Sequence, residues 1–414
     1  MRIICVGAGP AGLYFGILTK LRDPAAQVTV LERNPDGVTY GWGVTFCDDM
    51  LDSLCAGDPV SAAEIRCNAA SWGDQVVLLG NQPTAHLDGY GYAIGRRHLL
   101  KLLAQRATGL GVEIHYGHPV DAESVQDQFA DADLVLAADG VNSQLRQQFT
   151  DEFGTKIDYG RNHYIWLGTT KVFTEFTYAF ERTEAGWIWF YAYPFDASTT
   201  TLIAECAPST WEGLGFDQLA PEKSLAELER IFLRHLDGHP LLLQTKEQGS
   251  SPWLNFTWIT NRSWYHGNVV LAGDAAHTAH FSVGCGTLLA IDDVLALNRK
   301  LQAHGGKREN VPAALKDYQR ERVASVGARQ RIARYSAEWF EQVESCTALD
   351  PTRFSYALGT TRFTNCPAPA GVPWLKHQAK QLSVGRRALR IVSTVRRRQP
   401  PPSYRAGASP SCIS

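Results

Sequence analysis

A glycine-rich turn near the N-terminus has the spacing of a dinucleotide-binding motif. Gly7, Gly9 and Gly12 form the pattern G-x-G-x-x-G, with Pro10 and Ala11 before the last glycine. The first glycine permits the tight bend, the second lets a pyrophosphate approach the backbone, and the third lets a helix pack on a strand. The chemistry that this pattern indicates is the binding of a nucleotide diphosphate.

An acidic residue follows the turn at the distance that a ribose-binding carboxylate requires. Glu32 ends an apolar segment and lies 20 residues after Gly12. A carboxylate there can accept hydrogen bonds from ribose hydroxyls. The segments around the turn read as a strand over 1–6, a helix over 10–21 and a strand over 27–31. Together with the glycine turn and Glu32, they predict a dinucleotide-binding βαβ unit. The alternative is a glycine turn with a surface glutamate.

A second group of glycine and acidic residues lies far along the chain. An apolar segment over 268–272 precedes Asp274, whose carboxylate could bind the ribityl hydroxyls of a flavin. Small residues then open a helix over 288–301, whose N–H groups can face the flavin or its pyrophosphate. These small residues are Gly284, Cys285, Gly286 and Thr287. An inert thiol is the favoured interpretation of Cys285. Because nicotinamide dehydrogenases do not need such a second motif, the pair favours a flavin.

Aromatic residues alternate in the middle of the chain. They recur at every second position over 187–193, which is the period of a strand, and antiparallel pairing is expected for such segments. One face of this strand, together with an earlier tryptophan, could line an apolar substrate pocket with polar tips, and a hydrophobic core is the alternative. The residues are Trp166, Trp187, Trp189, Tyr191 and Tyr193.

Composition excludes several classes of protein. The chain has 414 residues, 44% of them apolar and 20% charged, which indicates two or three domains and excludes disorder, collagen and disulfide-knot classes. Forty basic and 42 acidic residues give a net charge of −2, which offers no basis for binding nucleic acid or an anionic membrane. Scattered cysteines without a C-x-x-C pair and the lack of a long apolar run predict a cytoplasmic protein without a metal site.

Three motifs in order resemble the single-component (class A) flavoprotein aromatic monooxygenases, which are related in fold to 4-hydroxybenzoate hydroxylase. They are the turn with Glu32, the segment 134–146 with Asp139 and Gly140, and the segment 273–286. A narrower resemblance rests on 41–44, on 158–166 and on a phenylalanine, Phe281, where most of the family has proline. By this narrower resemblance, the chain is most similar to salicylyl-CoA 5-hydroxylase. It is also similar to 2-aminobenzoyl-CoA monooxygenase and to the violacein-pathway indole hydroxylase.

The resemblance implies an α/β FAD-binding domain of Rossmann type, interrupted by an antiparallel-sheet substrate domain and followed by helices. The FAD-binding domain comprises 1–160 and 262–345, including a long helix over 312–343, and the substrate domain comprises 161–261. Tyr318–Arg322 on the long helix is expected to pack it on the FAD-binding domain. The remainder, 346–414, is a basic segment whose end is expected to be disordered. A solvated tail is favoured there over contacts with the phosphates of a CoA- or carrier-bound substrate.

The resemblance also implies the cofactors, FAD and a transiently bound NADH or NADPH. An arginine, Arg96, is placed at the FAD pyrophosphate, with Arg97 as the neighbouring possibility. The full set of implied FAD-binding residues is Gly7, Gly9, Pro10, Ala11, Gly12, Glu32, Arg33, Arg96, Val120, Asp139, Gly140, Asp274, Gly284, Cys285, Gly286 and Thr287.

The implied reaction is hydroxylation of an electron-rich aromatic ring with NAD(P)H and O2 through a flavin C4a-hydroperoxide. An aryl-CoA such as salicylyl-CoA is the expected substrate, and an indole or another natural-product intermediate is the alternative. A flavin dehydrogenase, a halogenase-like relative and a non-catalytic flavoprotein are the other classes. His280 is the candidate acid–base residue, with a structural imidazole as the alternative. His277 is expected to be structural, bonding the backbone.

Overall fold

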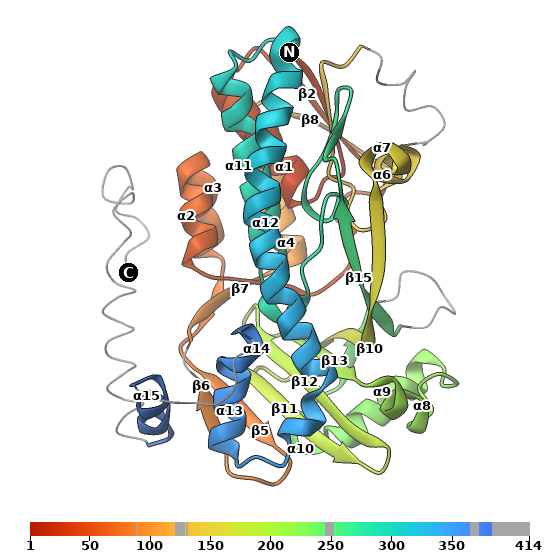
Figure 1. Ribbon diagram of the computed structural model, residues 1–414, viewed down its shortest axis with the longest axis vertical. Coiled ribbons are helices and arrows are strands. Elements are labelled where there is room, and N and C mark those ends of the chain that lie inside the picture. The colour runs from red at the N-terminus through yellow and green to blue at the C-terminus, as the bar shows by residue number, and fades with distance from the viewer. Residues whose placement is uncertain (88, 121–128, 130, 245–251, 365–371, 383–414) are drawn as a thin grey trace.

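The computed structural model describes residues 1–87, 89–120, 129, 131–244, 252–364 and 372–382 (Figure 1). The predicted βαβ unit is confirmed as β1 (Arg2–Val6), α1 (Pro10–Arg22) and β2 (Gln27–Glu32). The two strands pair in parallel, and proline in the first turn of α1 suits a position that needs no N–H donor.

The first sheet has six strands in the order β16-β17-β9-β1-β2-β8. All are parallel except β16 (Tyr265–His266) at one edge. The other members are β8 (Glu113–Tyr116), β9 (Leu134–Ala137) and β17 (Val269–Leu271). Because parallel strands end at the same edge of a sheet, Gly7, Asp139 and Asp274 follow three adjacent strands at one edge, where ligands bind in such folds.

Helices cover this sheet and extend beyond it. The predicted helix over 288–301 is α11 (Gly286–Ala303), which packs against α1. The predicted long helix is α12 (Val311–Glu341), which Figure 1 shows running along the long axis of the molecule. It packs on α11 near its start and reaches β10 (Thr155–Thr169) of the second sheet.

The second sheet follows the order β14-β10-β13-β12-β11-β5-β6, with β15 also paired to β10. Its pairs are antiparallel except that of β11 with β5. The strands besides β10 are β5 (Gln75–Leu79), β6 (Ala85–Leu87), β11 (Phe176–Thr183), β12 (Gly186–Pro194), β13 (Thr200–Cys206), β14 (Leu241–Leu243) and β15 (Leu254–Asn261). The sheet thus takes β5 and β6 from the segment before 161, and the division into domains at 160 and 261 stays a prediction.

The two faces of this sheet contact different partners. Ile165, Phe190 and Leu202 form a buried cluster with residues of the helices α8 (Pro208–Gly213), α9 (Pro221–Ile231) and α10 (Leu233–Leu236). Trp189 and Tyr191, on the opposite face, pack with Phe340 of α12 and with α13 (Pro351–Gly359). The predicted alternation along β12 is therefore confirmed.

The remaining elements are a small third sheet and several helices. A small sheet joins β3 (Gly43–Phe46), β7 (Gly91–Gly95) and β4 (Ala70–Trp72). The helices are α2 (Asp48–Gly57), α3 (Pro59–Cys67), α4 (Arg96–Gly109), α6 (Gln144–Gln148), α7 (Thr150–Phe153), α14 (Thr361–Thr364) and α15 (Val372–Gln381).

The basic C-terminal segment is described only as far as residue 382. Lys380 on α15 is buried, and its Nζ donates to the carbonyl of Leu87 at 3.1 Å. The predicted disordered end lies outside the described residues. Within the described ranges, no helix is long and apolar enough to cross a membrane.

Candidate active site

The three glycines of the N-terminal turn meet different demands. Gly7 has φ +103°, and a Cβ there would lie 2.4 Å from the carbonyl oxygen of Ala138. A Cβ on Gly12 would lie 2.0 Å from the carbonyl oxygen of Gly7. At Gly9 the nearest atom to such a Cβ is 3.9 Å away. The protein itself therefore requires the first and third glycines, whereas the second leaves open space beside the backbone, as a bound pyrophosphate requires.

Glu32 holds the edge of this turn. Its Oε2 accepts a 2.9 Å hydrogen bond from the backbone N–H of Ala8, and its Oε1 accepts from the backbone and side-chain nitrogens of Asn34 at 2.9 and 2.7 Å. The carboxylate is half-buried at the end of β2. This is the position from which an acidic side chain reaches a ribose.

Asp274 lies in a recess at the same sheet edge. Its neighbours Gly273 and Ala275 are buried in a 3-10 turn, whereas Asp274 itself is exposed. Protein atoms surround the recess, and the resulting loss of hydration raises the pKa of Asp274, against the lowering effects of His277 and Arg96. The carboxylate is thus accessible and faces cationic groups.

Arg96 begins α4 beside this recess. Its backbone N–H donates to Trp42 at 2.7 Å, and its Nε donates to Thr39 Oγ1 at 3.2 Å. Desolvation lowers the pKa of Arg96, and the charges of Asp274 and Glu32 act in the opposite direction. Arg97 is exposed. Of the two predicted candidates, Arg96 is therefore the one that lies among the acidic groups.

The second motif contacts the third. Asp139 Oδ2 accepts from the backbone N–H of Gln144 at 2.8 Å, and desolvation raises the pKa of this carboxyl. Arg146 is 1% exposed, and its Nη1 donates to the carbonyl of Ala275 at 3.2 Å. Gly140 has φ +82° and open space at its Cβ position. These contacts fix the turn after β9 against the turn that carries Asp274.

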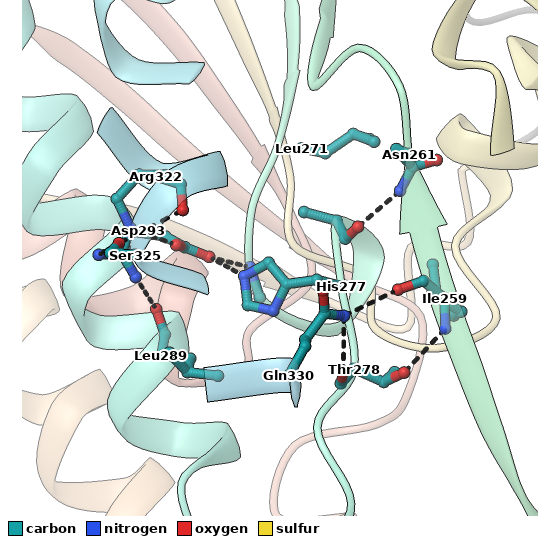
Figure 2. Close-up of polar contacts among 12 residues, drawn as sticks. Ile259, Asn261, Leu271, His277, Thr278, Leu289, Asp293, Arg322, Ser325 and Gln330 are labelled. Carbon is teal, nitrogen blue, oxygen red and sulfur yellow. Dashed lines mark hydrogen bonds and ion pairs between the residues drawn. The ribbon is translucent and has the colours of Figure 1, made fainter. Parts of the chain in front are cut away.

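A buried ion network lies behind the third motif (Figure 2). His277 Nε2 lies 2.8 Å from Asp293 Oδ2, and the same oxygen accepts from the backbone N–H of Gly273 at 2.8 Å. Arg322 Nε donates to the other oxygen, Oδ1, at 2.8 Å. The prediction that His277 bonds the backbone is wrong, because its ring nitrogen pairs with a carboxylate. Its structural role is consistent with this geometry.

The sequence reasoning missed Asp293. The signal was an acidic residue on the apolar face of the helix predicted over 288–301. The expected packing of Tyr318–Arg322 on the first domain is confirmed, since Tyr318 Oη donates to the carbonyl of Leu271 at 2.9 Å. Figure 2 also shows Gln330 of α12 donating to the carbonyl of Thr278 at 2.9 Å.

Small residues lead from this network into α11. Gly284 has φ +62°, and Cys285 is the N-terminal cap residue of α11. Burial raises the pKa of Cys285 to about 11, which agrees with the interpretation as an inert thiol. Gly286 has open space at its Cβ position, and Thr287 is half-buried in the first turn of the helix.

His280 is enclosed by aromatic rings. It is 5% exposed, its Nδ1 lies 2.8 Å from Ser282 Oγ, and its ring centroid lies 4.8 Å from that of Phe256. Burial, and then the charge of Arg362, lower the pKa of His280 to about 3. The imidazole is therefore neutral near neutral pH. Its catalytic role stays a prediction.

The aromatic face of the second sheet carries a carboxyl group that the sequence reasoning missed. Tyr191 Oη donates to Glu205 Oε2, and Asn162 Nδ2 donates to Glu205 Oε1 at 2.7 Å. Trp189 Nε1 donates to Tyr191 Oη at 3.0 Å. Burial raises the pKa of Glu205 to about 7. The available signal was one acidic residue inside an otherwise apolar and threonine-rich strand.

The five predicted pocket residues have different surroundings. Trp187 and Trp189 line a cavity of about 570 Å³ together with Phe340 of α12. Tyr193 Oη donates to the carbonyl of Gly43 at 3.0 Å, so its polar tip is engaged by β3. Trp166 is partly buried against the cluster that contains Trp189 and Tyr191. Their role in binding substrate stays a prediction.

Two further predicted cofactor residues lie near the first sheet. Arg33 is exposed directly after β2, and Val120 is half-buried against the first core cluster. Their contacts with a cofactor stay predictions.

Fold and site together define the class of this protein. The open side of Gly9, the carboxylates of Glu32 and Asp274, and Arg96 lie along one sheet edge and fit FAD, which needs space for a pyrophosphate and acceptors for ribose and ribityl hydroxyls. The buried aromatic face of the second sheet contacts Phe281 on the loop that follows Asp274. This is the arrangement of FAD-dependent aromatic hydroxylases.

Comparison with known proteins confirms this class. The model of the FAD binding domain family matches residues 1–331, and the chain belongs to this family. Salicyloyl-CoA 5-hydroxylase of Streptomyces sp. is 37% identical over 369 residues, which cover 86% of this chain and 69% of that protein. The 3-hydroxy-4-methyl-anthranilyl-[aryl-carrier protein] 5-monooxygenase of Streptosporangium sibiricum is 34% identical over 344 residues, which cover 83% of this chain and 90% of that protein. Protodeoxyviolaceinate monooxygenase of Chromobacterium violaceum is 30% identical and covers 89% and 96%.

Solved structures confirm the fold. PqsL of Pseudomonas aeruginosa, a probable FAD-dependent monooxygenase, has a TM-score of 0.64 at 17% identity and covers 87% of this chain and all of that one, 100%. The tetrameric form of 2-methyl-3-hydroxypyridine-5-carboxylic acid oxygenase has a TM-score of 0.63 at 16% identity, and the match covers 86% of this chain and 95% of that chain. The chain is an FAD-dependent aromatic monooxygenase of class A.

Proposed function

We propose that this monooxygenase hydroxylates the ring of an aryl thioester, with a hydroxybenzoyl-CoA such as salicyloyl-CoA as the substrate. Two relatives support the thioester, because their names state an aryl-CoA and an aryl-carrier-protein substrate, and both are at least 34% identical to this chain. A third relative acts on protodeoxyviolaceinate, at 30% identity. NADH or NADPH is the reductant in this proposal, and the location is the cytoplasm.

The observation that carries the proposal is the meeting of the aromatic sheet face with the loop after Asp274. The ring of Phe281 on this loop lies 4.7 Å from that of Tyr164 and 5.8 Å from that of Tyr191, measured between centroids. The charges of Asp274 and Glu205 both raise the pKa of Tyr164, after burial. Tyr164, which pairs with Glu205 across β10 and β13, therefore lies near both the carboxyl of the sheet and the recess that fits the flavin.

This geometry assigns separate tasks to the residues. When bound, FAD supplies the activation of O2 and the transfer of one oxygen atom to the ring. The buried rings of Trp189, Tyr191 and Phe281 exclude water from the reacting ring and orient it. Glu205 exchanges a proton near neutral pH and is hydrogen-bonded to Tyr191, so this pair can take up a phenolic proton.

The proposal is tested by anaerobic reduction of the FAD-loaded protein with NADH and with NADPH. Flavin absorbance is followed with salicyloyl-CoA, benzoyl-CoA, free CoA, free salicylate and an indole, each added separately. We expect salicyloyl-CoA to accelerate reduction and to yield a hydroxylated thioester when O2 is admitted. Acceleration by free salicylate or by the indole, without any effect of the thioesters, would contradict the thioester proposal and leave the class unchanged.

A further inference from the structure

One buried arginine near the aromatic sheet face has neither a hydrogen-bond acceptor nor an ion-pair partner among the described residues. Arg362 on α14 is 4% exposed, and its guanidinium carbon lies 4.3 Å from the ring centroid of Phe363 and 5.4 Å from that of Phe340. It also lies 5.7 Å from the ring centroid of Tyr178. A guanidinium carries its charge at all accessible pH values and has five N–H donors. The rings accept part of this charge, but they do not accept hydrogen bonds in the guanidinium plane.

The donors of Arg362 are unsatisfied within the described residues. Its Nε and Nη1 are buried and donate to no acceptor there, and no carboxylate of the described chain lies within ion-pair distance. The sequence after Asp350 has no aspartate or glutamate, so the segments that follow α14 have no acidic side chain to supply. Because an unpaired buried charge is costly, an acceptor from outside the protein is indicated.

The position of Arg362 relates it to the active site. Its charge is the second cause, after burial, of the lowered pKa of His280 on the loop that precedes Gly284. The same charge acts to lower the pKa of Tyr191 on the sheet face, against the larger raising effect of burial. Geometry agrees, because Phe340, which Arg362 contacts, has its ring centroid 5.2 Å from that of Tyr191. Arg362 therefore lies near the sheet face that carries Tyr191 and Glu205.

We propose that Arg362 binds the ionised ring oxygen of the substrate, so that the hydroxyaryl group is held as a phenolate. The inference rests on the proposed function for the identity of the substrate, because the acyl group of a thioester is uncharged and the ring oxygen is then the anion nearest the reacting ring. In this step the phenol O–H bond breaks, its electron pair stays on oxygen, and the proton passes to the Tyr191–Glu205 pair. A phenolate ring is the more electron-rich and reacts faster with an electrophilic oxygen.

The test compares two ligands that differ only in the ring hydroxyl. Dissociation constants of salicyloyl-CoA and benzoyl-CoA are measured by flavin absorbance for the FAD-loaded wild type, Arg362→Met and Arg362→Lys. The control is Arg353→Met, because Arg353 is exposed and paired with Asp350 on the surface. We expect Arg362→Met to weaken salicyloyl-CoA binding about 10- to 100-fold and to change benzoyl-CoA binding little. The ratio of the benzoyl-CoA dissociation constant to the salicyloyl-CoA dissociation constant should therefore fall. Arg362→Lys keeps the charge without the planar fork, so its ratio lies between the two.

A second measurement reads the ionisation state of the bound ligand. Salicyloyl-CoA isotopically labelled at the oxygen-bearing ring carbon is bound to each variant, and the chemical shift of that carbon distinguishes phenol from phenolate. We expect phenolate in the wild type at pH values below the pKa of the free ligand, and phenol in Arg362→Met under the same conditions. Should Arg362→Met fail to fold or to hold FAD, the ratio and the chemical shift of Arg362→Lys decide.

If Arg362 only packs between aromatic rings, its replacement should weaken the binding of both thioesters equally. An unchanged ratio of dissociation constants, or a bound phenol in the wild type, therefore overturns the inference. The proposed function stands in that case if salicyloyl-CoA still accelerates reduction. If neither thioester affects the wild type, the thioester proposal fails separately. The same ratio is then measured with the hydroxylated free aromatic that does accelerate reduction and with its deoxy analogue, and an unchanged ratio again overturns the role of Arg362.

Discussion

The Nε2 atom of His277 lies 2.8 Å from Oδ2 of Asp293, and both side chains are buried. Asp293 is on α11, and its other oxygen binds Arg322 of α12. One carboxylate therefore connects the loop after Asp274 to the two helices that pack behind it. The position of Asp274, which is predicted to bind the flavin, depends on this connection, since Gly273 also donates to Asp293.

Asp293→Asn is expected to destabilise the protein by about 3–5 kcal/mol, because it leaves Arg322 without its charged partner in the interior. Urea unfolding of the purified protein measures this loss. Asp317→Asn is the matched control, since Asp317 pairs with Arg320 at the surface, and we expect it to change stability little. Equal effects of the two substitutions would contradict the importance of the buried network.

The pH dependence of this network follows from the pKa of Asp293. Burial alone would raise that pKa, but His277, Arg322 and the N–H of Gly273 together hold it below the ordinary value of 3.8. The stabilisation is therefore present above about pH 4 and is lost as the pH falls through the lowered value. Wild type and Asp293→Asn should converge in stability as acid is added.

Substitution of two glycines by alanine separates folding from cofactor binding. Gly12→Ala would place a Cβ 2.0 Å from the Gly7 carbonyl oxygen, so we expect loss of soluble, folded protein. Gly9→Ala meets no atom closer than 3.9 Å, so we expect a folded protein that purifies with little FAD, because the methyl group occupies the space beside the pyrophosphate. Circular dichroism and bound flavin are the measurements. Full FAD occupancy in Gly9→Ala would contradict the placement of the pyrophosphate.

Asp274→Ala is expected to weaken FAD binding by about 10- to 100-fold, which is the effect of removing charge-assisted hydrogen bonds to the ribityl hydroxyls. Flavin fluorescence during titration of the apoprotein measures the dissociation constant. Asp217→Ala, at an exposed site within the predicted substrate domain, is the control. Normal FAD affinity in Asp274→Ala would mean that the third motif is misplaced.

Local patterns predicted the strands and turns of the predicted cofactor site, because each of these elements depends on a short-range requirement. Gly7, Gly12 and the apolar strands are fixed by neighbours in the turn and by alternation or burial along the segment. Glu205 and Asp293 each carry a local signal, an acidic residue in an apolar segment, but their partners come from distant strands and helices, so the local pattern does not identify their contacts. The pairing of β5 with β11 likewise joins segments far apart in the sequence.

The aromatic strand shows the limit of a periodic pattern. The aromatic residues at every second position from Trp187 to Tyr193 lie on one face of β12, as predicted. The side chains that this face contacts come from distant parts of the chain. Tyr191 meets Glu205 and Phe340, whereas Tyr193 meets Gly43. Periodicity gives the direction of a side chain, and only the tertiary fold gives its surroundings.

Glu205 is expected to make the wild type less stable as the pH rises. Its folded pKa of about 7 lies above the ordinary value of 4.5, so the folded protein holds a proton that the unfolded chain releases between these values. That difference corresponds to about 3 kcal/mol, fully present below about pH 4.5 and lost by about pH 7. Urea unfolding of wild type and Glu205→Gln across this range measures it, and parallel curves for the two proteins would contradict the raised pKa.

The pH profile of the reaction separates His280 from Glu205. An imidazole whose pKa is about 3 does not change charge near neutral pH, whereas a carboxyl whose pKa is about 7 does. We therefore expect an ionisation near pH 7 in the rate of substrate-stimulated flavin reduction or of hydroxylation to persist in His280→Ala and to disappear in Glu205→Gln.

His280→Ala should keep FAD, and lower coupling of NAD(P)H oxidation to product would support contact of His280 with the reacting groups. Unchanged coupling in His280→Ala would remove it from the catalytic residues. Loss of the ionisation in His280→Ala alone would show that the imidazole, not the carboxyl, exchanges the proton.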